Sequence, residues 1–334
     1  MKILVTGGAG YIGSHTIIEL FNRGYKDIVS VDNYLNSSEI EYGKLAKILG
    51  VKVSYKELDL ANESECLEFL KSNHFDAIIH FAALKSVPES VEMPVLYYKN
   101  NLNALLNILQ GMKENHIKKI IFSSSCSVYG NPNILPVTEA TPFGRAESPY
   151  AHTKQIGENI IQSFCKANPQ IKALSLRYFN PAGAHISGLI GEVKTKRPNN
   201  LVPIIAQNAI GMREKFTVFG TDFNTKDGSC IRDYIHVSDI ADAHVLAMEF
   251  LDRMDTNYDV FNLGSGSGST TLEVVNAFEK LKDVELNYEI GPRRDGDVET
   301  IYANNAKAKE LLNWSPKHDL HDIVSTAWAW QQNA

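Results

Sequence analysis

A predicted strand that runs straight into closely spaced glycines is the feature that most restricts how this chain folds. Residues 2–6 read as the strand, the loop is Gly7-Gly8-Ala9-Gly10-Tyr11-Ile12-Gly13, and an amphipathic helix is expected at 12–23. Gly7 permits a tight turn, Gly10 has no Cβ to hold a ligand away, and Gly13 lets the helix pack closely on the strand. Unpaired N–H groups at the start of the helix then attract phosphate. This context predicts a dinucleotide-binding site.

Alternating strands and helices fill the first half of the chain. Strands are expected at 2–6, 28–32, 52–57, 77–81, 120–124 and 172–178, and helices at 12–23, 39–49, 63–73, 93–115 and 148–168. This rhythm is typical of an α/β fold in which helices cover both faces of a Rossmann-like, doubly wound parallel sheet. It weakens after Asn180, where residues 181–202 read as a long loop.

The second half predicts a smaller, mixed α/β substrate-binding domain. Strands are expected at 216–219, 231–236, 259–263 and 284–289, and helices at 202–213, 238–252, 271–282, 304–312 and 319–332. Thr270 and Glu273 have the spacing of a capping box for the helix at 271. We therefore divide the chain into an NAD-type dinucleotide domain at 1–180 and a substrate domain at 181–334, whose later segments are free to cross back to the first.

The composition argues against several classes of protein. A net charge of −6 does not supply the basic surface that nucleic-acid binding needs. No apolar run reaches the roughly 18 residues of a membrane helix, and no secretory leader is recognisable at the amino terminus. The four cysteines are scattered without the spacing of a metal site or a disulfide framework. We expect a cytoplasmic protein with no nucleic-acid, membrane or metal partner.

Asp32 at the end of the second strand favours NAD as the dinucleotide. It lies 19 residues beyond Gly13, where a carboxylate accepts hydrogen bonds from ribose hydroxyls and repels a 2′-phosphate. Asp59, after the third strand, is a second candidate on the adenine side. The small residues of Phe81-Ala82-Ala83 let a cofactor pass close to the backbone, and Lys85 is placed to reach its ribose or pyrophosphate.

Tyr150 and Lys154 predict an acid/base pair, because residues four apart share one face of a helix. A free tyrosine has a pKa of about 10, and a neighbouring ammonium together with an oxidised nicotinamide is expected to lower it. Ser125 follows the strand at 120–124, and active-site groups belong at the carboxyl ends of such strands. We expect it to bind the reacting oxygen or to shuttle its proton.

These residues stand in longer motifs that identify a family resemblance. The chain resembles the extended short-chain dehydrogenase/reductase family and, within it, is similar over almost its whole length to the UDP-glucose (UDP-galactose) 4-epimerases. The matching stretches are Val5-Thr6-Gly7-Gly8-Ala9-Gly10-Tyr11-Ile12-Gly13-Ser14-His15, Asp32-Asn33, Phe81-Ala82-Ala83-Leu84-Lys85, Phe122-Ser123-Ser124-Ser125, Val128-Tyr129-Gly130, Tyr178-Phe179-Asn180-Pro181, Asp227-Gly228-Ser229-Cys230-Ile231-Arg232-Asp233-Tyr234-Ile235-His236-Val237 and Arg293-Arg294-Asp295-Gly296-Asp297. The glycine and Tyr/Lys motifs indicate only the superfamily, whereas the last two stretches are more specific to the epimerases.

The resemblance implies reversible epimerisation of UDP-galactose and UDP-glucose at C4 by an isomerase that holds NAD. Tyr150 would take the proton from the 4-hydroxyl, a transient 4-keto sugar would turn over in the pocket, and hydride would return to its other face. The matching cofactor positions are Gly7, Gly10, Tyr11, Ile12, Gly13, Asp32, Asn33, Asp59, Leu60, Phe81, Ala82, Ala83, Lys85, Asn100, Ser123, Tyr150, Lys154 and Tyr178. The matching substrate positions are Lys85, Ser125, Tyr150, Asn180, Asn200, Leu201, Phe219, Arg232, Arg294, Asp297 and Ile301. The family also suggests a homodimer.

Several alternatives remain open at this point. Ile301 matches the position beside the sugar's 2-substituent and is intermediate in size, so a UDP-N-acetylhexosamine 4-epimerase or a dual-specificity enzyme stays possible. A nucleotide-sugar 4,6-dehydratase is a more remote alternative, because related dehydratases carry two acids where this chain has Cys126 and Ser127. A non-catalytic NAD-sensing protein is also remote, since it has no need for the tyrosine, lysine and serine together. Pro88, where family members often have glycine, implies a stiffer local backbone.

Overall fold

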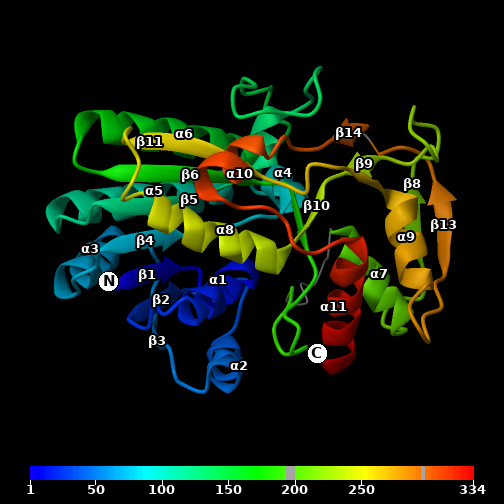
Figure 1. Cartoon of the computed structure of the whole chain (residues 1–334), viewed down its shortest axis with the longest axis horizontal. Helices are drawn as coiled ribbons and strands as arrows, with labels where there is room; N and C mark the ends of the chain where they lie inside the picture. Colours follow the sequence, from blue (N-terminus) through cyan, green and yellow to red (C-terminus); the bar gives the residue numbers. More distant parts are fainter. Residues whose placement is uncertain (193–199, 295–297) are drawn as a thin grey trace.

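A seven-stranded sheet forms the body of the protein, in a computed structural model that describes residues 1–192, 200–294 and 298–334 (Figure 1). Its strands lie in the order β11-β6-β5-β4-β1-β2-β3, and every neighbouring pair is parallel. The strands are β1 (Ile3–Thr6), β2 (Ile28–Asp32), β3 (Ser54–Glu57), β4 (Ala77–His80), β5 (Lys119–Ser125), β6 (Lys172–Tyr178) and β11 (Tyr258–Leu263). The strand order reverses at β1, which makes this a doubly wound sheet and confirms the predicted fold class.

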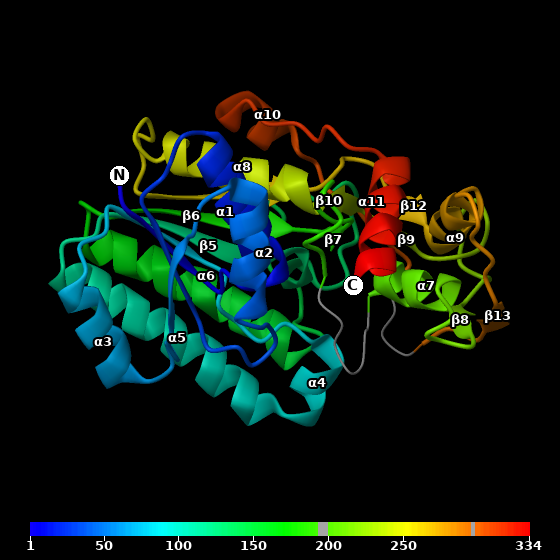
Figure 2. The same ribbon diagram turned by 90° about the horizontal axis from the view of Figure 1, so that it is seen from below.

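Helices cover both faces of the sheet and enclose two separate apolar cores. The helices of the first half are α1 (Tyr11–Asn22), α2 (Ile40–Leu49), α3 (Glu63–Ser72), α4 (Val87–Glu92), α5 (Pro94–Glu114) and α6 (Pro149–Ala167). One core joins α1, α2 and α8 (Val237–Phe250) to the sheet, and the other joins α3, α5 and α6 to its opposite face. Figure 2 shows α8 and α5 on opposite sides of the strands. Because both faces are covered, the central strands are apolar throughout rather than alternating.

The remaining elements form a smaller lobe at one end of the sheet, drawn on the right of Figure 1. Its helices are α7 (Leu201–Ala209), α9 (Thr271–Glu279) and α11 (Leu320–Asn333), and its strands are β7 (Asn180–Ala182), β8 (Phe216–Phe219), β9 (Ile231–Arg232), β10 (Tyr234–His236), β12 (Ser269–Thr270), β13 (Tyr288–Gly291) and β14 (Thr300–Ile301). A third apolar core binds α7, α9 and α11 to β8. The capping box of Thr270 and Glu273 at the start of α9 is confirmed.

Two later segments lie against the first half of the chain. Strand β11 pairs with β6 at the edge of the large sheet, and α8 packs on α1. The short helix α10 (Ala306–Leu312) contacts both β11 and α8, and Trp314 just after it donates from its indole nitrogen to the Asp239 carbonyl at 2.9 Å. After residue 236, segments that follow one another along the chain therefore alternate between the large sheet and the smaller lobe. The division at residue 180 stays a prediction.

The structure departs from the expected elements in a few places. The strand expected at 231–236 is divided into β9 and β10, because the buried Asp233 between them turns its carboxylate to the backbone N–H groups of Ser265 and Ala303. Helix α4 was not expected. It places Pro88 in its first turn, where a missing N–H costs no helical hydrogen bond, and Ser86 caps it. The last expected strand of the second half begins later, at Tyr288. A single turn of 3₁₀ helix, η1 (Cys126–Tyr129), also follows β5.

Within the described residues, no helix combines the length and the apolar character needed to cross a lipid bilayer. All four cysteines carry free thiols.

Four buried histidines predict that the fold loses stability in mild acid. Burial lowers the pKa of His15, His80 and His236 to about 3 and that of His244 to about 4. In the unfolded chain a histidine has a pKa of about 6.5, so below that pH the unfolded state binds protons that the folded state does not. Stability is thus present above pH 6.5 and is lost as pH falls, with a slope of up to about 1.4 kcal/mol per pH unit for each histidine.

Replacing one of these groups is expected to reduce that slope. Urea denaturation of His80→Asn between pH 7 and pH 5 should show a weaker pH dependence of the unfolding free energy than the parent protein. The control is His116→Asn, at an exposed position whose φ of 59° asparagine tolerates. An unchanged slope in the His80 variant would contradict the assignment of a buried neutral imidazole.

Candidate active site

The glycine loop has the geometry of a phosphate site. Gly7 has a φ of 69°, in the left-handed region, and a Cβ at Gly13 would lie only 2.3 Å from the Gly7 carbonyl oxygen. Helix α1 therefore lies closer to the loop after β1 than it could with any residue other than glycine at position 13. Gly10 precedes α1, no side chain caps the helix, and its first turn contains no acidic residue. The N–H groups at its start are thus available to an anion, and the loop fits a dinucleotide.

Asp32 faces this loop from the end of β2. Its carboxylate accepts hydrogen bonds from the Ala9 N–H at 3.1 Å, the Tyr34 N–H at 3.0 Å and the Ser37 hydroxyl at 2.8 Å. The structure therefore brings Asp32 to the glycine loop, as the sequence predicts, and adds Ser37 as a partner that sequence reasoning missed. The buried hydroxyl of Tyr34 next to it has no hydrogen-bond partner among the described residues. Asn33, between them in the chain, accepts a hydrogen bond from the Leu35 N–H at 3.2 Å.

The other adenine-side candidates are less directly placed. Asp59 is exposed and accepts from the Ala61 N–H at 3.0 Å, which holds it in a turn. Leu60 is buried and its carbonyl accepts from Asn107 at 2.9 Å. Their positions at the end of β3 are compatible with the predicted role and do not test it.

After β4 the backbone passes close to the glycine loop, and Lys85 forms an ion pair with a residue of the second half of the chain. A Cβ at Gly7 would lie 2.9 Å from the Ala82 nitrogen, so Phe81, Ala82 and Ala83 pass directly beside the glycine loop. The Lys85 ammonium is paired with Glu192 at 2.9 Å. Glu192 also accepts from the Asn200 amide at 2.8 Å, which the sequence did not predict.

Nearby, Tyr11 and Asn100 make local contacts. Tyr11 donates to the Gly183 carbonyl at 2.6 Å and thereby joins the start of α1 to the segment after β7. The Asn100 amide donates to Asn101, which in turn holds both backbone groups of Leu84. Ile12 is half-buried beside the first apolar core.

The predicted acid/base residues meet at the end of β5. Ser148 caps α6 and Pro149 opens it, so that Tyr150 and Lys154 lie on its first turns. The Lys154 ammonium lies 5.8 Å from the centre of the Tyr150 ring and donates to the Ser123 carbonyl at 2.7 Å. The Ser125 side chain lies beside the Tyr150 phenol and lowers its pKa by hydrogen bonding. The structure thus brings together Tyr150, Lys154 and Ser125.

The protein alone shifts the Tyr150 pKa in the direction opposite to the expected one. Burial raises it to about 12, and the hydrogen bond from Ser125 opposes this only in part. Burial also lowers the Lys154 pKa to about 8, against the stabilising charge of Glu158. Desolvation by the protein therefore decides the direction of the Tyr150 shift, and the lowering that the sequence argument expected from the Lys154 ammonium is not seen.

The smaller lobe gathers the predicted nucleotide-side residues. Arg232 on β9 and Ile301 on β14 are register partners. The Arg294 guanidinium lies 4.9 Å from the centre of the Phe219 ring. Burial raises the pKa of Tyr234, and the positive charges of both arginines oppose that rise, so the two guanidiniums lie near one phenol. Asn180, Asn200 and Leu201 stand at the starts of β7 and α7. Asp297 lies outside the described residues.

Cys126 lies between the predicted acid/base residues and the predicted nucleotide-binding residues. It directly follows Ser125, and burial raises its pKa to about 12, with Asp233 acting in the same direction and Arg232 against it. Cys126 in turn acts on Tyr150. The Arg232 guanidinium and the Tyr150 phenol therefore flank the same short segment. Tyr178, at the end of β6, lies beside Tyr150 and Ser123.

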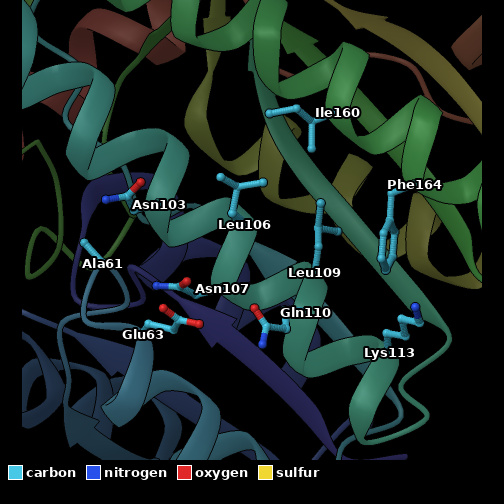
Figure 3. A pocket seen from close by; sticks show the side chains of 10 residues that line it. All are labelled: Ala61, Glu63, Asn103, Leu106, Asn107, Leu109, Gln110, Lys113, Ile160 and Phe164. Atoms are coloured by element: carbon cyan, nitrogen blue, oxygen red, sulfur yellow. The ribbon is translucent and has the colours of Figure 1, made fainter.

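A surface groove lies apart from this site. It has a volume of about 600 Å³ and lies over α5 and the second half of α6, where Leu106, Leu109, Ile160 and Phe164 line it (Figure 3). Tyr150 and Lys154 lie in the first turns of α6 and do not line it. The groove is thus a separate feature of the first-domain surface.

Comparison with known proteins agrees with the fold and shows the family. The family model described as "NAD dependent epimerase/dehydratase family" matches residues 3–264. A UDP-glucose 4-epimerase of Bacillus subtilis is 46% identical over 100% of this chain and 97% of its own length. The solved structure of UDP-glucose 4-epimerase from Bifidobacterium longum in complex with NAD⁺ and UDP is 43% identical, with a TM-score of 0.94 over 100% of this chain and 98% of that one.

A second solved structure gives the same result. The UDP-glucose 4-epimerase of Stenotrophomonas maltophila, with bound NAD and formylated UDP-arabinopyranose, is 40% identical, with a TM-score of 0.96 over 100% of this chain and 98% of that one. The fold and the site define a dinucleotide-binding α/β enzyme. The chain belongs to the NAD-dependent epimerase/dehydratase family.

The close approach at Gly13 predicts a large effect of a single methyl group. Gly13→Ala places a Cβ within 2.3 Å of the Gly7 carbonyl oxygen, so α1 has to move away from the loop. We expect a loss of bound NAD, measured by its absorbance after acid release, and a lower melting temperature. The control is Gly43→Ala in α2, where a Cβ meets nothing within 4 Å. NAD retention equal in both variants would contradict the phosphate site.

Proposed function

We propose that this protein catalyses the reversible interconversion of UDP-galactose and UDP-glucose by inverting the configuration at C4 of the hexose. The observation that carries the proposal is the meeting of Tyr150, Ser125 and Lys154 at the carboxyl edge of the sheet, with Arg232 beside the same segment. Identity of 46% to a UDP-glucose 4-epimerase over nearly the full length supports the substrate class. We also propose that residues 1–180 hold the cofactor and 181–334 the substrate.

NAD fits the glycine loop and Asp32. Gly7, Gly10 and Gly13 let the pyrophosphate approach the start of α1, and Asp32 accepts from ribose hydroxyls. Phe81, Ala82 and Ala83 line the path beside the loop, and Asn33, Asp59, Leu60, Asn100 and Tyr178 are its further predicted contacts. When bound, NAD would supply the hydride chemistry, accepting hydride from C4 and returning it to the opposite face of the sugar.

Tyr150 moves the proton at the 4-hydroxyl oxygen. A phenol with a pKa of about 12 holds its proton at neutral pH, and the positive charges of Lys154 and of a bound cofactor favour its ionised form. Hydrogen bonding from Ser125 to the phenol also favours its ionised form. Lys154 is held by the Ser123 carbonyl, which leaves its remaining protons for the cofactor ribose.

The nucleotide is held by the smaller lobe. Guanidinium groups bind a diphosphate bidentately, and Arg232 and Arg294 lie together beside Tyr234. Asn180, Asn200, Leu201 and Phe219 are further predicted nucleotide contacts, and Lys85 would exchange its Glu192 partner for substrate. A firm hold on UDP and few direct contacts to the hexose let the sugar turn between its two faces. Asp297 is a further predicted contact.

Ile301 and the segment after Ser125 bear on the alternatives. Ile301 is 6% exposed and lies beside Arg232, so an N-acetyl group would have to displace it. The positions after Ser125 are Cys126 and Ser127, which carry no carboxyl group for a 4,6-dehydratase. These residues therefore favour a C4 epimerase of UDP-hexoses that carry no N-acetyl group.

We further propose that the protein is a homodimer and works in the cytoplasm. The groove over α5 and α6 is lined by Leu109, Ile160, Phe164 and the exposed Leu106, an apolar surface that a second copy would cover. Four free thiols fit a reducing compartment. Sedimentation at the mass of one chain would refute the dimer, and immunolocalisation outside the cytoplasm would refute the compartment.

The test of the function needs no added cofactor. Purified protein incubated with UDP-galactose should yield UDP-glucose, followed by coupled oxidation of the product. A 4-keto-6-deoxy product would identify a dehydratase, and absence of any product would identify a sensing protein. UDP-N-acetylgalactosamine, assayed in parallel, tests the wider specificity.

Tyr150→Phe is expected to keep NAD bound but to lower kcat by about 10²- to 10⁴-fold, because proton transfer at the 4-hydroxyl is lost. Steady-state rates and NAD content after acid release measure the two effects. The melting temperature checks that the fold is intact. Turnover close to that of the parent protein would remove Tyr150 from its proposed role.

Asp32→Ala is expected to weaken the preference for NAD over NADP, because the carboxylate no longer repels a 2′-phosphate. Dissociation constants of the two dinucleotides for stripped protein give the ratio. Asp255→Ala, a remote exposed carboxylate, is the matched control. The same ratio in both variants would count against the ribose contact.

A further inference from the structure

The last three residues of β5 each contact a different residue on one face of α6. The pairs are the Ser125 side chain with Tyr150, the Ser123 carbonyl with Lys154, and the Ser124 hydroxyl with Glu158. The helix residues are spaced by four, so they lie one above another. The first two pairs belong to the proposed chemistry. The third pair, Ser124 with Glu158, repeats the pattern one helical turn further along α6 and has no role in the proposed chemistry.

Glu158 forms a buried ion pair. Its side chain is 3% exposed, and that of Arg177 on β6 is 5% exposed. Arg177 donates from Nε to one carboxylate oxygen at 2.9 Å and from Nη2 to the other at 2.6 Å. Removing two such charges from water costs several kcal/mol for each, and an apolar pair of similar size is often as stable. Stabilisation of the fold is therefore a weak explanation for the presence of this buried ion pair.

The pair connects the elements that carry the site. From Arg177, Nη1 donates to the Tyr129 hydroxyl at 2.8 Å, and that hydroxyl donates to Asn262 on β11 at 2.6 Å. Tyr129 ends η1, the turn that begins directly after Ser125. A single network thus fixes α6, β5, β6 and η1 relative to one another.

We propose that Glu158 is a positioning residue, which aligns the β5 serines with α6 and keeps Lys154 as an ammonium beside Tyr150. The inference rests on the proposed function. Lys154 is 4% exposed, and without a negative partner burial favours its neutral form. The other groups that face it are Tyr150 on its own helix and His80 on β4, which is itself held neutral. Neither supplies that negative charge, and Glu158 does.

Removing the carboxylate charge should move the titration of Lys154. In Glu158→Gln we expect the Lys154 pKa, measured from the Cε shift of ¹³C-lysine-labelled protein and assigned with Lys154→Arg, to fall by about one unit. The alkaline limb of the kcat profile should move to lower pH by the same amount, kcat at pH 8 should fall about fivefold, and KM for UDP-galactose should stay within about twofold. The residues proposed to bind UDP lie in the smaller lobe, so KM for UDP-galactose should change little.

Three variants separate positioning from a structural role. Glu158→Asp keeps the charge and should restore the alkaline limb, whereas Ser124→Ala removes one hydrogen bond and should leave the Lys154 titration in place. If Glu158→Gln does not fold, Glu158→Gln with Arg177→Met removes the unpaired cation, and the low Lys154 pKa should persist in it.

A lower melting temperature with an unmoved Lys154 titration and an unmoved alkaline limb would overturn the inference. Failure of the proposed function is distinguishable, because the parent protein would then not convert UDP-galactose at all. The lysine titration remains measurable in that case.

Discussion

Seven strands that all run in one direction are the constraint on which this structure depends. Parallel neighbours place their carboxyl ends at one edge. There β2, β5 and β6 end in Asp32, Ser125 and Tyr178, and β1 and β4 are followed directly by Gly7 and Phe81. The order reverses at β1, where two neighbouring connections leave for opposite faces and open a crevice. A shift of one residue in any pairing would turn these side chains to the other face, so the paired registers hold the site together.

Burial sets the chemistry of that crevice. It raises the pKa of Tyr150 and lowers that of Lys154, so both groups are driven toward their neutral forms. Two protein contacts act against this, the hydrogen bond from Ser125 and the charge of Glu158. The balance places the lysine close to its titration point and leaves the phenol protonated at neutral pH.

Local sequence signals predicted the elements that depend on local physics. The bounds of β2 and β6 were predicted to the residue, because each is an apolar run closed by polar residues. The glycine loop, Asp32 and the Tyr150–Lys154 pair followed from motif spacing. The division of 231–236 was missed because it depends on Asp233 reaching Ser265 and Ala303, which no local pattern encodes. Glu192 was missed for the same reason, since its partners Lys85 and Asn200 lie on separate elements.

Residue patterns along the chain were enough to predict the parallel α/β fold, the phosphate loop and a candidate acid/base pair, since each prediction rests on residues close together in the chain. Only the tertiary structure decided how those groups are charged and what holds them. It buried Tyr150 and Lys154 deeply enough to shift both pKa values, and it placed Arg177, from a different strand, against Glu158. Desolvation and long-range ion pairing depend on which segments meet in space, and spacing along the chain does not report that.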